Sequence, residues 1–196
     1  MPHPKSDVFQ KIIKDWHYFA PCLGTNITIY DSEFGYSNYA NGFKSINPER
    51  LLEQKSLFYI YSITKTFTAI VVMRLIENGL ISLNDPIINH LADIDLPKEV
   101  TIKNSLNHTS GAPNYTDANK ENPSKPWSFE YVINKTCNGK LDFSPEEKWH
   151  YSNTGYMLLL LMIESVTNKS YAKNVDDLIV KKNRVKKYLC CRKYRR

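Results

Sequence analysis

The sequence contains little of what marks a membrane-spanning, metal-binding or disulfide-linked protein. Its longest uninterrupted apolar run, Met157 to Ile163, has seven residues, whereas a helix needs about 20 apolar residues to cross a bilayer. The four cysteines are Cys22, Cys137, Cys190 and Cys191. None forms a C-x-x-C pair or has a histidine at zinc spacing, and adjacent cysteines are poorly placed for a mutual disulfide. We therefore expect no transmembrane segment, no metal site and no cofactor.

The N-terminus also lacks the apolar core of a secretory signal peptide. Residues 1–7 lead directly into an amphipathic stretch, so we expect this chain to stay in the cytoplasm. With 196 residues, of which 42% are hydrophobic and 23% charged, the chain has the composition of a globular protein. This length suffices for one sizeable core, or for one domain and a fragment of another.

The net charge of +6 is not spread evenly over the chain. Residues 181–196 contain nine lysines and arginines and no acidic residue, so residues 1–180 carry a net charge of −3. A block of like charges is usually a solvated, disordered end, and we interpret residues 181–196 in this way. Such a tail could also bind phosphates or an anionic membrane surface, which leaves a basic-tail binding module as one alternative. We expect no nucleic-acid partner.

Residues 1–61 are predicted to form a helix and a small group of strands. Apolar residues at helical spacing predict a helix over residues 6–19, with Ser6 as its N-cap. Alternating polar and apolar residues predict strands over 25–30 and 36–43, on either side of a turn. A third short strand is predicted over 57–61 from its apolar and aromatic residues.

Residues 62–180 are predicted to be mostly helical. Helices are predicted from residue 62 to Asn78-Gly79, from 84 toward 91, and over 102–106, 127–137, 154–166 and 170–180. Thr101, Asn153 and Ser170 are the predicted N-caps of three of them, and Asn168 is a predicted helix stop. The order of elements predicts an α+β fold, in which residues 181–196 form a separate basic tail.

Two S-x-x-K patterns occur, at Ser62–Lys65 and at Ser170–Lys173. Positions i and i+3 lie on one face of a helix, so the lysine amine can reach the serine hydroxyl and activate it as a nucleophile. The spacing alone also fits a serine that merely caps a helix. Context separates the two pairs, because Ser62 follows an apolar stretch and opens a buried-looking helix, whereas Ser170 opens an exposed one.

A Y-x-N pattern at Tyr151–Asn153 is the second candidate for chemistry. It directly precedes a strongly apolar helix, where a tyrosine hydroxyl can face a cleft and an asparagine can bind a substrate amide. Asn153 fits a simple N-cap equally well. The same pattern at Tyr36 and Tyr39 falls in the predicted hairpin, so we interpret those two copies as strand and turn residues.

Four ordered blocks of this chain resemble the class C β-lactamase, D-Ala-D-Ala carboxypeptidase and esterase family of penicillin-recognising serine hydrolases. They are Leu57 to Ala69, Leu75 to Pro86, Thr101 to Gly111, and Trp149 to Tyr156. The resemblance extends over about residues 22–180. It implies a β-lactamase/DD-peptidase-like fold and a small-molecule or peptide substrate, namely a β-lactam, a D-Ala-D-Ala peptide or an ester.

The resemblance also implies roles for individual residues. Ser62 would be the acylated nucleophile and its backbone N–H half of the oxyanion hole, while Lys65 would help to deprotonate it. Tyr151 would be the second proton-transfer group, and Asn153 would bind the acyl-side amide of the substrate. Which of Lys65 and Tyr151 is the base is left open. His108 also lies in a family motif, and we interpret it as a residue that stabilises its loop.

The resemblance breaks in several places. The family's third motif, K-[ST]-G or H-x-G, does not occur after Tyr151. Glu146 and Asn168 occupy positions where the family usually has glycine, as does Leu160, and Ser105 replaces an expected leucine. We therefore expect a truncated copy that lacks the C-terminal strands of the sheet. An inactive remnant of the family is accordingly an alternative to an active hydrolase.

Overall fold

The computed structural model describes residues 3–20, 22–91, 94–118, 133 and 136–182. The chain divides into two compact units, Met1–Tyr59 and Ile60–Arg196. The predicted helix over 127–137 and the basic tail lie almost entirely outside the described residues. No helix in the described part of the chain is long and apolar enough to span a membrane.

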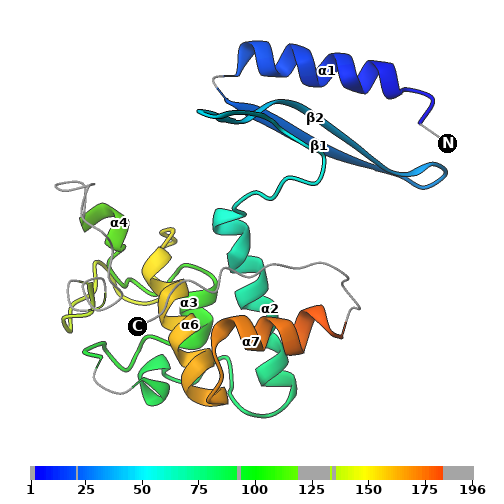
Figure 1. Cartoon of the computed structure of the whole chain (residues 1–196). Helices are drawn as coiled ribbons and strands as arrows, with labels where there is room; N and C mark the ends of the chain where they lie inside the picture. The colour runs from blue at the N-terminus through cyan, green and yellow to red at the C-terminus, as the bar shows by residue number, and fades with distance from the viewer. Residues whose placement is uncertain (1–2, 21, 92–93, 119–132, 134–135, 183–196) are drawn as a thin grey trace. The chain divides into compact units, whose positions relative to one another are not determined.

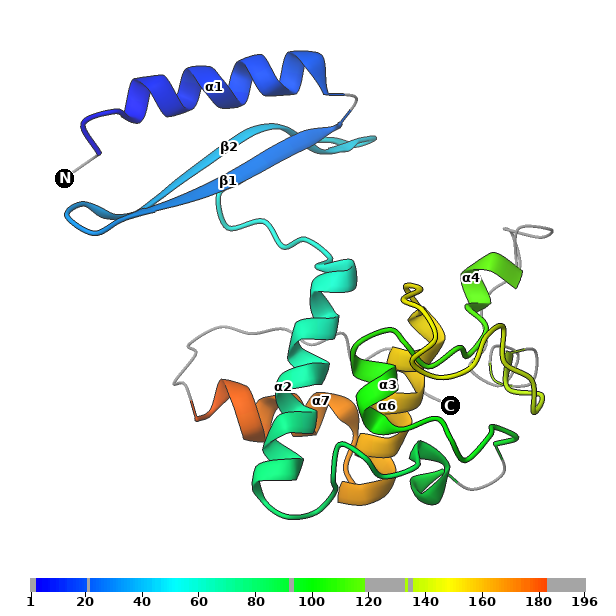
Figure 2. The same cartoon turned by 180° about the vertical axis from the view of Figure 1, so that it is seen from behind.

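The first unit is a helix packed on an antiparallel sheet. Its elements are α1 (Ser6–Phe19), β1 (Gly24–Asp31), β2 (Gly35–Ile46) and β3 (Glu49–Leu51), with the strands in the order β1-β2-β3. Figures 1 and 2 show α1 lying along the face of the β1–β2 hairpin. Buried Ile13 on α1 and Tyr39 on β2 belong to this interface, where the Tyr39 ring lies 5.8 Å from that of Phe9.

The sequence-based prediction of this unit was correct for the helix and the hairpin but wrong in two details. Ser6 begins α1 without capping it, since the N-cap position is Lys5 and no side chain caps the helix there. The third strand is Glu49–Leu51, and residues 57–60 form no strand. A short run of apolar and aromatic residues cannot specify a pairing partner, so composition alone misplaced this strand.

The second unit is helical. It contains the 3-10 turn η1 (Tyr61–Ile63), α2 (Thr64–Glu77), the 3-10 turn η2 (Ile87–His90), α3 (Ile102–Leu106), α4 (Tyr115–Ala118), α6 (Asn153–Thr167), α7 (Tyr171–Val175) and the π-helical turn η3 (Asp176–Val180). Thr101 caps α3 in a reciprocal capping box with Asn104, and Ser170 caps α7, both as predicted. Lys181, the first residue of the predicted tail, pairs with Asp176 at 3.1 Å.

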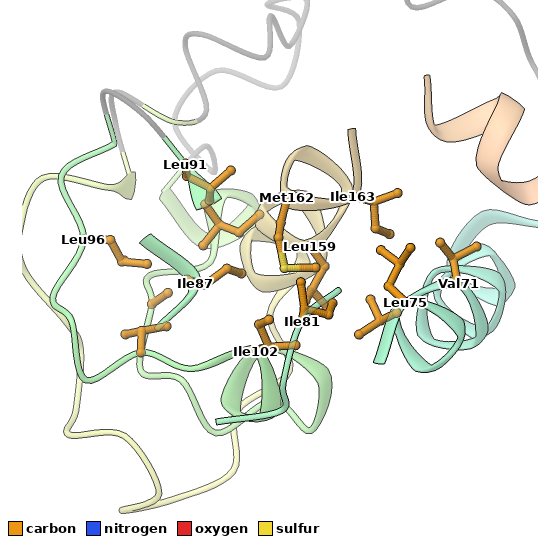
Figure 3. Close-up of a cluster of buried hydrophobic side chains, with 14 of the residues drawn as sticks. Val71, Leu75, Ile81, Ile87, Leu91, Leu96, Ile102, Leu159, Met162 and Ile163 are labelled. Atoms are coloured by element: carbon orange, nitrogen blue, oxygen red, sulfur yellow. The ribbon is translucent and has the colours of Figure 1, made fainter. Parts of the chain in front are cut away.

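The core of this unit lies between α2 and α6. Val71 and Leu75 of α2 face Leu159 and Ile163 of α6, and all four side chains are buried (Figure 3). The core continues through Met162 to the segments that connect the helices. Each large aliphatic side chain removed from water contributes about 1.5–3 kcal/mol, so this contact fixes the two helices against one another.

Two residues at positions where the resemblance implies glycine adopt the backbone conformation that glycine favours. Glu146 has φ of 68° and Asn168, where α6 ends, has φ of 52°. Asparagine tolerates the left-handed conformation well, whereas a glutamate there carries strain of about 1–2 kcal/mol. The Lys103 amine lies 2.9 Å from the Glu146 carboxylate, and the Glu146 N–H donates to the Thr109 carbonyl. The fold therefore retains the turn although the glycine is lost.

Gly111 and Gly79 provide a matched pair for testing close packing. Both have φ near +70°, but a Cβ on Gly111 would lie 1.9 Å from the Phe143 carbonyl oxygen, whereas nothing lies within 4 Å of one on Gly79. We expect Gly79→Ala to destabilise the chain by about 1 kcal/mol and Gly111→Ala by about 3 kcal/mol or more. Urea denaturation of both variants measures the difference, and equal losses would contradict the close approach.

Candidate active site

The four predicted site residues come together where α2 begins and α6 begins. Ser62 lies in η1, directly before α2, and Lys65 lies in the first turn of α2. Tyr151 precedes α6, and Asn153 is its first residue. All four belong to the second unit. The packing of α2 on α6 thus brings side chains almost 90 residues apart in sequence into direct contact.

Hydrogen bonds connect these four side chains. The Ser62 Oγ lies 2.7 Å from the Tyr151 hydroxyl, a pair in which either oxygen can donate. The Lys65 amine donates to the Ser62 Oγ at 3.3 Å and to the Asn153 Oδ1 at 2.7 Å. Ser62 therefore has two groups within reach that can accept or relay its proton.

Aromatic rings surround the Lys65 amine. Its nitrogen lies 4.8 Å from the centre of the Tyr151 ring and 5.5 Å from that of Tyr156. The Tyr156 hydroxyl donates to the Leu106 carbonyl at 2.9 Å, which holds this ring in place. Sequence reasoning missed Tyr156 because a tyrosine on a strongly apolar helix looks like an ordinary core residue.

Ser152, and not Asn153, caps α6. The Ser152 Oγ accepts a hydrogen bond from the Gly155 N–H at 3.1 Å, so the predicted capping role of Asn153 was wrong. The two residues are adjacent, and only the direction of each side chain decides which one caps. With Ser152 as the cap, the Asn153 side chain is directed to Lys65.

The backbone around the site is braced by two segments that precede α6 in the sequence. The Asn153 N–H donates to the Asn114 Oδ1 at 3.0 Å. The Ser152 N–H donates to the His108 Nδ1 at 3.1 Å, and the His108 ring lies 4.6 Å from that of Tyr151. Asn114 gave no sequence signal, because a single asparagine in a polar loop has no distinctive pattern.

Tyr61, the residue before Ser62, has φ of 42°, which lies in the left-handed region. A non-glycine residue in this region carries strain of about 1–3 kcal/mol, and such residues cluster at functional sites. The left-handed conformation of Tyr61 turns the chain into η1, which places Ser62 directly before α2. Ser62 is consequently exposed, while Lys65 and Tyr151 are half-buried beside it.

Burial, hydrogen bonds and the Lys65 charge shift the pKa values of Tyr151, His108 and Tyr156. Burial raises the pKa of Tyr151, but hydrogen bonds with Lys65 and Ser62 and the lysine charge outweigh it, so the net pKa lies below the ordinary value of 10.0. Burial, followed by repulsion from the Lys65 charge, lowers the pKa of His108. Burial raises the pKa of Tyr156, and interaction with Tyr151 raises it further.

The other copies of both motifs have structural roles. The Ser170 Oγ caps α7 by accepting from the Lys173 N–H, and the Lys173 amine pairs with Asp177 on the outside of the helix. Tyr36 and Tyr39 both lie in β2. The second S-x-x-K pair is therefore a helix cap, in agreement with the sequence-based interpretation of its context.

Within the described residues, no group of three or more His, Cys, Asp or Glu side chains could hold a metal ion. Cys22 is exposed and Cys137 buried, and both are free thiols. The arrangement offers a serine hydroxyl, a lysine amine and a tyrosine hydroxyl, which together suit acyl transfer through a serine.

An α+β chain with this serine, lysine and tyrosine constellation has the features of a β-lactamase-like serine hydrolase. Comparison with known families agrees, since the family model described as Beta-lactamase matches residues 22–185. The chain belongs to this family, and the resemblance found in the sequence is confirmed. The α+β, β-lactamase/DD-peptidase-like fold is likewise confirmed by the solved structures that it matches.

Three relatives illustrate the similarity. The chain is 34% identical over 151 residues to a penicillin-binding protein of Bacillus subtilis (strain 168), covering 74% of this chain and 31% of that protein. It resembles a D-stereospecific amidohydrolase from Streptomyces sp. with a TM-score of 0.76 and 26% identity, over 92% of this chain and 55% of the other. An octameric penicillin-binding protein homologue from Pyrococcus abyssi matches with a TM-score of 0.75 and 26% identity, over 91% and 43% of the two chains.

The chain thus spans about a third of the length of the curated relative that it matches, and about half of the solved structures. The region that matches the family model contains the S-x-x-K and Y-x-N residues. Membership in the family rests on this region.

The lowered pKa of Tyr151 leads to a direct test. In Lys65→Met the hydrogen bond and the positive charge are both lost, so we expect the pKa of Tyr151 to rise. NMR titration of ring-labelled tyrosine, with Tyr151→Phe to assign the signal, measures the shift. Lys173→Met is the matched control, because Lys173 pairs with Asp177 and should leave Tyr151 unchanged. A Tyr151 signal that titrates identically in Lys65→Met would refute the coupling.

Proposed function

We propose that this chain is a serine hydrolase that forms an acyl-enzyme on Ser62, with a β-lactam, a D-Ala-D-Ala peptide or an ester as substrate. The observation that carries the proposal is the position of the Ser62 Oγ, which is within hydrogen-bond reach of both the Tyr151 hydroxyl and the Lys65 amine. The relatives support the class of substrate, since one is a penicillin-binding protein and another a D-stereospecific amidohydrolase.

In the proposed acylation, the Ser62 oxygen attacks the substrate carbonyl carbon and loses its proton to the phenolate form of Tyr151. We favour Tyr151 over Lys65 as the acceptor because it is the nearer group, at 2.7 Å against 3.3 Å. The Lys65 amine, placed over the ring of Tyr151, stabilises the phenolate by its charge. The proton then passes to the leaving nitrogen or oxygen as its bond to the carbonyl carbon breaks.

Two further groups would bind the substrate. The Asn153 Oδ1 accepts from Lys65, which directs the Asn153 amide nitrogen to a substrate carbonyl. The Ser62 backbone N–H, ahead of α2, would donate to the oxyanion that forms on the carbonyl oxygen. In the second stage, water attacks the acyl-enzyme ester carbon and gives up a proton, which Tyr151 passes to the Ser62 oxygen as the bond to the acyl group breaks and the acid is released.

The absence of the third motif is the observation that favours a second candidate, a family member that binds but does not turn over. No K-[ST]-G or H-x-G tripeptide follows Tyr151 within these 196 residues. The loss of one oxyanion donor costs about 10²–10³ in turnover. We therefore expect slow acylation from this 196-residue chain by itself, and a reactive fluorophosphonate is a more sensitive probe than a substrate.

Labelling with a fluorophosphonate tests the nucleophile. We expect one covalent adduct on the folded chain, located at Ser62 by mass spectrometry and absent in Ser62→Ala. Ser170→Ala is the matched control, since Ser170 heads the second S-x-x-K pair but only caps α7. A folded chain without an adduct would support the non-catalytic alternative, and an adduct that persists in Ser62→Ala would contradict Ser62 as the nucleophile.

Replacement of Tyr151 tests the proton transfer. Tyr151→Phe keeps the ring but removes the hydroxyl, so we expect acylation of Ser62 by a fluorescent penicillin to slow by about 10²–10⁴. Tyr36→Phe should acylate at the rate of the unmodified chain, because Tyr36 lies in β2 within a second Y-x-N pattern. An unchanged acylation rate in Tyr151→Phe would assign the base role to Lys65.

A further inference from the structure

His108 contacts the chain on both sides of Tyr151. Its Nδ1 accepts a hydrogen bond from the Ser152 N–H at 3.1 Å, and its carbonyl oxygen accepts one from the His150 N–H at 2.9 Å. The residues before and after Tyr151 are therefore both bonded to one histidine. The His108 ring also packs against the Tyr151 ring, with centroids 4.6 Å apart. These three contacts fix the position of Tyr151.

The position of His108 is itself well defined. Its φ of 64° turns the loop between α3 and α4 so that carbonyl and imidazole both point toward the segment before α6. The ring lies 5.1 Å from that of Tyr156 and 5.9 Å from that of Trp149. The imidazole thus packs among three aromatic rings, and it is partly withdrawn from water.

The hydrogen bond to Ser152 requires a neutral imidazole. A backbone N–H can only donate, so the Nδ1 must present its lone pair and the proton must lie on Nε2. Protonation would place a second N–H opposite that of Ser152 and add a positive charge near Lys65. In the described part of the chain, the titratable groups that face the ring are Lys65 from α2, Tyr151 before α6, and Tyr156 on α6. None of the three can compensate a positive imidazole at acid pH.

We propose that His108 is a pH-sensitive positioning residue, whose neutral imidazole holds Tyr151 against Ser62 and whose protonation releases Tyr151 from it. The effect on acylation rests on the function proposed above. The linkage between His108 and Tyr151 does not, since it concerns the position of a side chain and exists with or without turnover.

The direction of the pH effect follows from the pKa of His108. We call the contacts of His108 with Ser152, His150 and Tyr151 the brace. Burial and the Lys65 charge lower the pKa of His108 below its ordinary value of 6.5, so the brace is intact at neutral pH. Since unfolding restores the ordinary pKa, the brace contributes its full stability above pH 6.5. That stability falls as the pH drops through the lowered pKa of His108. Acylation should be lost over the same range.

NMR titration of the full chain tests the linkage without any need for activity. We expect the Ser152 amide signal, the Tyr151 ring signal and the His108 imidazole signal to change together, with one shared midpoint below pH 6.5. In His108→Asn this shared titration step should vanish from the Ser152 and Tyr151 signals. The Asn side chain offers an uncharged acceptor and tolerates the left-handed backbone. His150→Gln is the matched control and should retain the step, because the exposed His150 side chain is not part of the brace. Ser152 and Tyr151 signals that stay constant while His108 titrates, or a step that persists in His108→Asn, would overturn the proposal.

Acylation rates provide the second readout. We expect His108→Phe, which keeps a ring but has no acceptor, to slow acylation of Ser62 by about 10- to 100-fold. His108→Asn should restore most of that rate and should lose the acid limb of the pH profile. If His108→Phe does not fold, the NMR comparison of the unmodified chain with His108→Asn still decides the question. If no chain is acylated while the NMR step is present, the proposed function fails and the brace stands.

Discussion

The contact between α2 and α6 is the constraint on which the rest of the second unit depends. Val71 and Leu75 on one helix and Leu159 and Ile163 on the other are withdrawn from water, and their packing fixes the two helices side by side. The site lies where both helices begin, and its lysine and asparagine are joined by a hydrogen bond across 88 residues of sequence. Apolar packing between the two helices thus determines the geometry of a polar site formed by other side chains where these helices begin.

The polar site works by sharing one lysine among several partners. The Lys65 amine reaches Ser62 and Asn153 and lies over two tyrosine rings, so its charge lowers the pKa of Tyr151 and helps to keep His108 neutral. A single change at Lys65 would therefore alter the nucleophile, its proton acceptor and the residue that positions that acceptor. Lys65 and Asn153 are therefore held in place by specific hydrogen bonds, unlike a lysine or an asparagine on an open protein surface.

Much of the local structure could be predicted from the sequence. The bounds of α1, the stop of α6 at Asn168 and the caps Thr101 and Ser170 all follow from interactions between residues a few positions apart. The failures have a common cause. The sequence did not reveal that Ser152 caps α6, that the third strand lies at Glu49–Leu51, or that Asn114 and Tyr156 support the site. In each case the partner of the residue, or the direction of its side chain, is decided by distant parts of the chain.

By itself, the sequence determined the family through its four ordered blocks. It also identified the Ser62–Lys65 pair, because a separation of three residues at the start of a helix places two side chains on one face. It could not separate this pair from Ser170–Lys173 by spacing. Sequence context separated the two pairs, and the tertiary structure shows the physical difference between them. The helix α6 packs beside α2, so Tyr151 and Asn153 contact Ser62 and Lys65, whereas Lys173 pairs with Asp177 in η3. The physical reason is one of range. Helical geometry acts over one turn, whereas hydrophobic burial acts between segments that the sequence leaves far apart.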